Sequence, residues 1–284
     1  MSKGAVVITG ASTGIGRSCA VRLDRAGFDV FAGVRKSEDG EALVASASAR
    51  LRPLIIDVTD ADSIASAAAE VNELTGGNLA GLVNNAGIAV AGPIEGLDLD
   101  QLRRQFDVNF FGQVAVTQAL LGAIRAAHGR VVFMSSVGGR KGGALPYASP
   151  YGASKHALEA LADSLRIEMR PFGVEVSIIE PGAVATPIWD KSTDAAAQQR
   201  EAIDPALNEI YGERMDKMSA LATKTGARGV DPEQVAEAVE RALTDDKPKT
   251  RQIVGREAKI QARLAGWLPS RAWDRLIERE VEKS

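Results

Sequence analysis

The sequence predicts an α/β protein built on a doubly wound parallel sheet. Short β-branched runs alternate with longer amphipathic stretches as far as residue 180, and no linker interrupts this alternation. The first run, residues 5–8, is apolar throughout, which is typical of a strand covered on both faces. We therefore expect a single domain over residues 1–284 with its core at 4–186.

Each element follows from its own residue pattern. After the first strand, residues 15–26 predict a helix that Gly27 ends, and Asp98 with Gln101 resembles a capping box that opens a helix reaching about residue 127. The remaining expected strands are 28–34, 54–56, 79–83, 130–134 and 174–179. The remaining expected helices are 38–49, 61–75 and 151–170.

The pattern changes beyond Pro187. Apolar residues recur there every three or four positions in a charged segment, at Ile203, Leu207, Ile210, Tyr211, Met215, Met218 and Leu221. This spacing predicts a helical substrate lid within about 187–228, or an ordinary surface helix packed on the core.

A C-terminal helical segment at about 255–284 carries further apolar residues, at Leu264, Trp267, Leu268, Trp273, Leu276 and Ile277. It would cover the substrate pocket or dock on another subunit. Binding to a membrane surface is a third, less favoured alternative.

Composition excludes several classes of protein. The chain has 284 residues with 34 basic and 37 acidic side chains, so it lacks the basic excess of a nucleic-acid-binding protein. One cysteine, Cys19, and two histidines permit no internal disulfide and are too few for the usual structural zinc sites, so we expect no metal. Neither a signal peptide nor a transmembrane segment is indicated, and we expect a cytoplasmic protein.

The stretch TGASTGIG, residues 9–16, has two interpretations. As G-x-S-x-G it matches a nucleophile elbow with Ser12 as a hydrolase nucleophile. As a glycine-rich turn before a helix it would bind the phosphates of a dinucleotide in a Rossmann-like fold, although its spacing is G-x-x-x-G-x-G. The turn follows the first strand, where no earlier strand can supply the oxyanion loop of a hydrolase, so we favour the dinucleotide. The expected contacts are Gly10, Ser12, Thr13, Gly14, Ile15 and Gly16.

The cofactor preference depends on the end of the second strand. The residue about 20 positions beyond the turn reads the adenosine ribose, and here the chain has Arg35 and no acid. Arg35 could pair with the 2′-phosphate of NADP(H), which we expect to be preferred, or could be a solvated side chain, which leaves NAD(H) possible. Asp57 and Val58, after the next strand, would contact the adenine, or Asp57 would cap the following helix.

A proton-transfer pair lies in the sequence YGASK. Tyr151 and Lys155 are four residues apart and so share one face of the predicted helix. A fixed cation within about 4–6 Å favours the phenolate, so we expect Lys155 to lower the pKa of Tyr151.

The order of these motifs resembles the short-chain dehydrogenase/reductase family over about residues 4–190. The shared features are the glycine turn, NNAG at 84–87, Asn109, the Ser135-Ser136 pair, YGASK, and the segment from Pro181 to Thr186. The resemblance implies an NAD(P)-dependent oxidoreductase acting on CH–OH groups. Within the family the sequence looks most like the steroid and retinol dehydrogenase branch, which also contains 3-hydroxybutyrate dehydrogenases.

The resemblance also implies roles for individual residues. Tyr151 would be the acid–base, Ser136 would hold the substrate oxygen, Lys155 would bind the nicotinamide ribose and Asn109 would anchor a relay water. Further cofactor contacts would be Asn85, Ala86, Gly87, Pro181, Gly182, Val184 and Thr186. The interval between Ser136 and Tyr151 is about two residues longer than the family pattern, so Ser135 is the alternative serine. Pairing of the long helices implies a homodimer or homotetramer.

Two questions remain open at this stage. Apolar segments at 88–94, 145–147 and 203–221 favour a hydrophobic alcohol or ketone as substrate, whereas a small 3-hydroxy acid would need a cation such as Arg140 or Lys141. A non-catalytic nucleotide-sensing protein on the same fold is the other alternative, but it would not need Tyr151.

Overall fold

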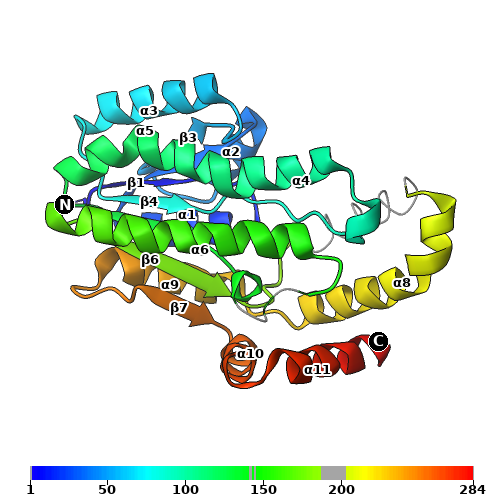
Figure 1. The fold of residues 1–284 in the computed structure, drawn as a ribbon. Coiled ribbons are helices and arrows are strands. Elements are labelled where there is room, and N and C mark those ends of the chain that lie inside the picture. The colour runs from blue at the N-terminus through cyan, green and yellow to red at the C-terminus, as the bar shows by residue number, and fades with distance from the viewer. Residues whose placement is uncertain (1, 141–142, 144, 187–202, 284) are drawn as a thin grey trace.

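A computed structural model describes residues 2–140, 143, 145–186 and 203–283 of the chain. Within these residues, seven parallel strands form one sheet in the order β3-β2-β1-β4-β5-β6-β7 (Figure 1). The strands are β1 (Ala5–Ile8), β2 (Asp29–Val34), β3 (Leu51–Ile55), β4 (Gly81–Asn84), β5 (Arg130–Met134), β6 (Glu175–Pro181) and β7 (Arg251–Val254). The predicted doubly wound parallel sheet is confirmed.

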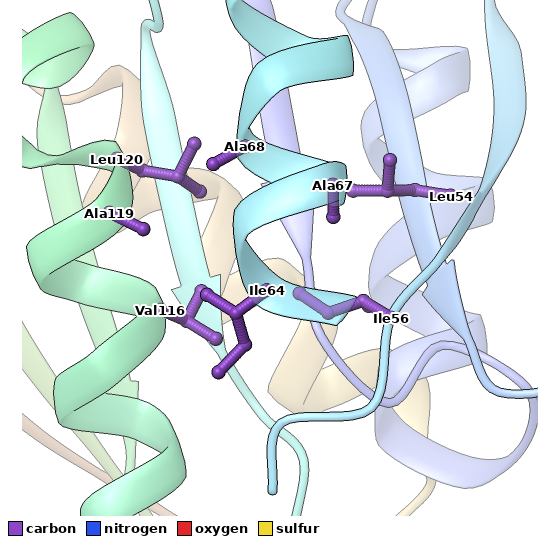
Figure 2. A pocket seen from close by; sticks show the side chains of 8 residues that line it. All are labelled: Leu54, Ile56, Ile64, Ala67, Ala68, Val116, Ala119 and Leu120. Atoms are coloured by element: carbon purple, nitrogen blue, oxygen red, sulfur yellow. The ribbon is translucent and has the colours of Figure 1, made fainter. Parts of the chain in front are cut away.

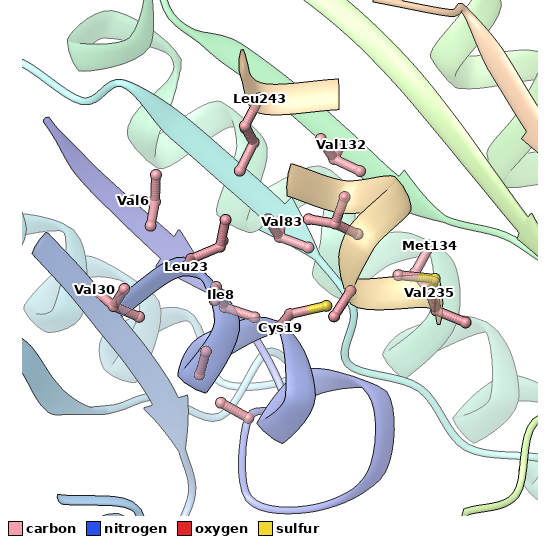
Figure 3. Packing of buried hydrophobic residues seen from close by; sticks show 14 of the residues in the cluster. Val6, Ile8, Cys19, Leu23, Val30, Val83, Val132, Met134, Val235 and Leu243 are labelled. Carbon is pink, nitrogen blue, oxygen red and sulfur yellow. The ribbon is translucent and has the colours of Figure 1, made fainter. Parts of the chain in front are cut away.

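Helices cover both faces of this sheet. They are α1 (Gly14–Arg25), α2 (Ser37–Val44), α3 (Ala61–Thr75), α4 (Leu99–Phe106), α5 (Gly112–Ala126), α6 (Ser149–Met169), α8 (Pro205–Ala227), α9 (Pro232–Thr244), α10 (Arg256–Trp267) and α11 (Ser270–Glu282). One apolar core joins the strands to α1 and α9, as Figure 3 shows, and a second joins them to α3, α5 and α6. Successive residues of β1 alternate between the two cores because side chains of a strand point to opposite faces.

The expected single helix over 98–127 is wrong in detail. Asp98 caps α4 by accepting a hydrogen bond from the Asp100 N–H at 2.9 Å, but a π-helical turn, Asp107–Phe111, separates α4 from α5. This turn directs the Asn109 side chain into the interior. The apolar spacing of residues 98–127 did not indicate this turn.

Two elements near the C-terminal end were not expected from the sequence. Helix α9 begins with Asp231 as its cap and packs its apolar residues under the sheet, next to α1. Strand β7 has the sequence RQIV and adds to the edge of the sheet beside β6. Its short, half-polar pattern does not distinguish a strand from a loop. The other predicted elements differ from the observed ones mainly at their ends, α2 being the most shortened.

Helix α8 forms most of the described part of the predicted lid, whose residues 187–202 lie outside the described structure. Its N-terminal end lies on the loop after β4, because a Cβ atom added to Gly96 would come within 2.8 Å of Ile203 and 3.4 Å of Leu207. Helix α11 packs against α8 (Figure 1). The predicted C-terminal segment is therefore helical. In it Trp273 is buried while Trp267 is 90% exposed.

No helix among the described residues combines the length and the apolar character needed to cross a membrane.

Candidate active site

The glycine turn lies at the carboxyl ends of β1 and β4, where the strand order reverses direction. Ligands of open α/β sheets bind at such a switch point. Gly10 has φ of +67°, and a Cβ atom on Gly16 would lie 2.1 Å from the carbonyl oxygen of Gly10. Only glycine fits these positions, because any side chain would collide with the backbone of the turn itself or of the NNAG segment.

The first turn of α1 offers its backbone N–H groups to an anion. Among the described residues no side chain caps this end: Thr13 is the N-cap residue without a capping hydrogen bond, and the first turn holds no acidic side chain. Helix N-termini of this kind favour phosphate. The turn around Ser12 and Ile15 can therefore hold a pyrophosphate.

Arg35 and Asp57 lie near each other beyond the ends of β2 and β3. Arg35 is exposed directly after β2. Hydrogen bonds from Thr59 lower the pKa of Asp57, and the positive charge of Arg35 lowers it further. The alternative that Asp57 caps the next helix is wrong, because Asp60 accepts the capping bonds of α3 at 2.9 and 3.1 Å. The Asp57 carboxylate, next to the buried Val58, therefore accepts its hydrogen bonds from Thr59 and not from the first turn of α3.

The NNAG segment is tied to the glycine turn through Thr9. The Thr9 hydroxyl accepts hydrogen bonds from the N–H groups of Asn85 and Ala86, both at 3.0 Å. The Asn85 amide donates back to the carbonyl oxygens of Thr9 and Gly10 at 3.0 and 3.1 Å. Thr9 is a site residue that was not expected from the sequence, where a threonine directly after a buried strand is its signal.

Asn109 connects the π-turn with the loop after β4. It is fully buried, its amide oxygen accepts from the N–H of Ile88 at 2.9 Å, and its amide nitrogen donates to Ser154 at 3.2 Å. Gly87 lies between it and Lys155, since an added Cβ would be 3.4 Å from the Asn109 oxygen and 3.7 Å from Lys155 Nζ. The structure therefore brings Asn109 and Lys155 together.

Gln105 was also missed. This buried side chain accepts from the N–H of Val90 at 2.7 Å and donates to the carbonyl of Ile88 at 2.8 Å. Together with Asn109, one helical turn away, it fixes the loop that follows β4. A polar residue at helical spacing from Asn109 was the only sequence signal.

The two serines after β5 have different partners. The Ser135 hydroxyl donates to Glu159 at 2.8 Å, inside the protein. The Ser136 hydroxyl accepts from the N–H of Gly138 at 3.1 Å and also forms a hydrogen bond with Tyr151. The geometry therefore favours Ser136 over Ser135 as the partner of the tyrosine.

Tyr151 and Lys155 lie side by side on α6. Lys155 Nζ is 5.9 Å from the centre of the Tyr151 ring and donates to the carbonyl of Met134 at 2.7 Å. Burial raises the pKa of Tyr151, and the hydrogen bond with Ser136 opposes that rise. Burial lowers the pKa of Lys155 to about 8. The expected net lowering of the Tyr151 pKa is wrong here, because loss of water around the phenol outweighs the favourable contacts.

The segment after β6 closes the same side of the site. Gly182 pairs with Val254 of β7, Val184 forms a bridge with Val230, and the side chain of Thr186 lies against Gly14, where an added Cβ would be 3.2 Å away. Pro181 ends β6 and directs the chain toward the glycine turn. The glycine turn and the segment from Pro181 to Thr186, which lie far apart in the sequence, are therefore in contact.

A small cavity between β3, α3 and α5 has no part in this site. Figure 2 shows eight apolar side chains around it, among them Leu54, Ile64 and Leu120. Its free space of about 10 Å³ barely equals one water molecule, and its walls offer no polar group. It is a packing defect and cannot bind a substrate.

Comparison with known proteins identifies the family of the chain. The family described as short chain dehydrogenase matches residues 4–197. Retinol dehydrogenase 5 of Mus musculus is 39% identical over 284 residues, covering 96% of this chain and 87% of its own. The NADPH-dependent 3-dehydrocapnine reductase of Ornithobacterium rhinotracheale is 34% identical and covers 98% of this chain and 97% of its own.

Solved structures give the same result. A short-chain dehydrogenase from Streptomyces avermitilis superposes with a TM-score of 0.74 and 31% identity, covering 94% of this chain and 97% of its own. Fold and site together define a nicotinamide-dependent oxidoreductase that acts on CH–OH groups. The chain belongs to the short-chain dehydrogenase/reductase family, and the resemblance inferred from its motifs is confirmed.

Proposed function

We propose that the protein interconverts an alcohol and a ketone or aldehyde on a hydrophobic substrate. The observation that carries this proposal is the meeting of Asn109, Ser136, Tyr151 and Lys155 beside a glycine turn open to phosphate. A sensor of nucleotides would need only the turn. The relative named retinol dehydrogenase 5 supports an apolar alcohol.

The proposed chemistry divides between cofactor and protein. The chemistry that a bound nicotinamide would supply is hydride transfer to the carbonyl carbon in reduction, or from the CH–OH carbon in oxidation. Ser136 donates a hydrogen bond to the carbonyl oxygen, on which negative charge develops during reduction, and Tyr151 gives that oxygen its proton. Burial raises the pKa of Tyr151 and so further favours the protonated phenol, the form that gives its proton in reduction. Lys155 would bind the nicotinamide ribose, and Asn109 would anchor the water that returns a proton to Tyr151.

The contacts of Arg140 favour an apolar substrate over a hydroxy acid. Arg140 Nη1 donates to both carboxylate oxygens of Glu180, at 3.0 and 2.7 Å, so its charge is already paired. It is therefore a poor partner for a substrate carboxylate. Lys141, the second cation considered, lies outside the described residues.

The test of the proposed function is the substitution Tyr151→Phe. We expect it to lower turnover by about 10²–10⁴-fold, the usual contribution of an acid–base group, while NADPH binding measured by fluorescence stays unchanged. Candidate substrates are retinaldehyde, a steroid ketone, an aliphatic aldehyde and acetoacetate. Unchanged turnover in the variant refutes the mechanism, and acetoacetate as the best substrate would establish the hydroxy-acid alternative. Ester cleavage that depends on Ser12 would establish a hydrolase.

We further propose NADP(H) as the preferred cofactor because of Arg35. The substitution Arg35→Asp should weaken NADPH binding at least about tenfold and leave NADH binding equal or stronger, since a charge-assisted pair with the 2′-phosphate is lost. Arg103→Asp on α4, whose side chain pairs with Asp100 on the surface, is the matched control. Equal loss for both cofactors would contradict the preference. A cytoplasmic location and a homo-oligomer complete the proposal.

A further inference from the structure

A cluster of charged side chains lies behind the catalytic residues, between α6, β6 and β7. We call it the charge cluster, and its members are Arg140, Glu159, Asp163, Glu180 and Arg251. The side chain of Glu180 is completely buried and that of Glu159 nearly so. Charges in such a place need several well-directed partners.

Arg251, from the last strand, contacts all three carboxylates of the cluster. Its two terminal nitrogens donate to the two oxygens of Asp163 at 2.8 and 2.6 Å, which is a bidentate pair. The same guanidinium lies 3.6 Å from Glu159 and, through Nε, 3.3 Å from Glu180. Arg166 also contacts Asp163. A planar guanidinium fixes the orientation of its partners as well as their distance.

Two of these carboxylates belong to the helix that carries the acid–base pair. Tyr151, Lys155, Glu159 and Asp163 are each four residues apart and form one stripe along α6. Glu159 also accepts the hydrogen bond of Ser135, next to Ser136. Through Glu159 and Asp163, Arg251 therefore contacts the same helix that carries Tyr151.

The third carboxylate holds the segment that carries Ser136. Ser136 begins a short turn, and Arg140 ends it by donating its N–H to the carbonyl of Val137 at 3.2 Å. The Arg140 side chain then pairs with Glu180, as described above, and the residue after Glu180 accepts a hydrogen bond from the Ser136 hydroxyl at 3.5 Å. Glu180 thus links this turn to Arg251.

We propose that Arg251 is a positioning residue that fixes Ser136 and Tyr151 relative to each other, through Glu180 and Arg140 on one side and Asp163 and Glu159 on the other. This inference rests on the proposed function. Strand β7 lies beyond the residues 4–197 that match the family, so the role belongs to a part of the chain that the family motifs do not include.

The experiment compares Arg251→Lys and Arg251→Met with the wild type, using NADPH and retinaldehyde. Lysine keeps the charge but cannot form the bidentate pair. We expect kcat to fall about tenfold in the lysine variant and up to about a hundredfold in the methionine variant, since small displacements of reacting groups have effects of that size. The Kd for NADPH should change less than kcat, because the glycine turn and Arg35, which would hold its phosphates, lie at the ends of β1 and β2.

Arg241→Lys is the matched control, since Arg241 forms a half-exposed pair with Glu237 on α9, outside the site. Its kcat should equal that of the wild type. If the Arg251 variants fold and keep the kcat of this control, the proposal is overturned. Should Arg251→Met fail to fold, the lysine variant and Asp163→Asn, whose side chain is partly exposed, decide the question.

Hydrogen exchange separates this proposal from the proposed function. Peptides covering residues 135–140 and 151–163 should exchange faster in Arg251→Lys than in Arg241→Lys. Turnover of Tyr151→Phe tests the proposed mechanism separately. Even if that mechanism is wrong, faster exchange in Arg251→Lys still establishes that Arg251 stabilises both segments. Unchanged exchange in these peptides contradicts the positioning role whatever the reaction is.

Discussion

Burial sets the protonation of the residues at the centre of the site. Lys155 has lost almost all contact with water, and the carbonyl of Met134 is the partner of its ammonium group. The charged form is therefore disfavoured, and the pKa of Lys155 falls from 10.5 to about 8. Below this pKa the folded protein must bury a positive charge, which opposes folding.

This cost predicts a dependence of stability on pH. The folded pKa of Lys155 lies below the unfolded one, so the unfolded chain binds more protons between about pH 8 and 10.5 and stability should rise with pH there. Lys155→Met removes the group. The unfolding free energy of the wild type relative to this variant should increase by roughly 3 kcal/mol between pH 7 and 10.5, measured by urea denaturation. A constant difference would show that the ammonium is not desolvated.

The sequence predicted which residue types meet in the site but not all of their states. The i, i+4 spacing places Tyr151 and Lys155 together in any helix, and the structure has them adjacent. The choice between Ser135 and Ser136 needed the position of Glu159, 24 residues further on. Whether the pKa of Tyr151 rises or falls depends on how deeply the fold buries the phenol, and the local sequence does not specify that burial.

At the level of elements, Tyr211 of α8 contacts two loops, the one after β4 and the one before α6. The Tyr211 hydroxyl donates to Glu95 at 2.7 Å, and its ring packs edge-on against Tyr147 at 6.4 Å between ring centres. Tyr147 has φ of +60°, a left-handed conformation that costs a non-glycine residue energy. Its carbonyl accepts from the N–H of Gly92 at 2.7 Å, which helps to hold it there. These contacts join α8, the loop after β4 and the segment before α6.

We predict that these contacts support binding of a hydrophobic substrate. Tyr211→Phe removes the hydrogen bond to Glu95 and should raise KM for retinaldehyde roughly threefold, with little change in kcat, since the contact is exposed and remote from Tyr151. Glu213→Gln changes a charge on the same helix that pairs with Lys217, and it should leave KM unaltered. If Tyr211→Phe and Glu213→Gln have the same KM for retinaldehyde, α8 is an ordinary surface helix.

Elements that are determined by residues within their own segment were predicted well. Elements that depend on contacts with residues far away in the sequence were not. The glycine turn, α3 and α6 follow from residues within each segment. In the π-turn the Asn109 amide oxygen accepts a hydrogen bond from the N–H of Ile88, 21 residues earlier in the chain, and local spacing does not reveal such a distant contact. Strand β7 pairs only because β6 offers it an edge.

At the level of the whole molecule, apolar side chains remain exposed on the long helices. Phe111 is 58% exposed at the start of α5 and Ile167 is 69% exposed near the end of α6. A second set lies on α10 and includes Trp267. Exposed apolar residues of this size are candidates for contacts between subunits.

We predict that the long helices form the main subunit interface. Phe111→Arg combined with Ile167→Arg should convert a dimer or tetramer to a smaller species in sedimentation velocity, because each change places an unpaired charge in the contact. Trp267→Ser should leave the oligomer intact. The reverse outcome would assign the interface to the C-terminal segment, and a monomeric wild type would contradict an oligomer altogether.

The sequence by itself determined the parallel sheet, the glycine turn and the tyrosine–lysine pair, because each depends on spacing within a few residues. The tertiary structure decided which serine contacts the tyrosine, how burial shifts the pKa values of Tyr151 and Lys155, and which charges surround Glu180. These properties depend on groups separated by tens of residues, and only folding brings such groups within hydrogen-bonding distance and removes water from between them.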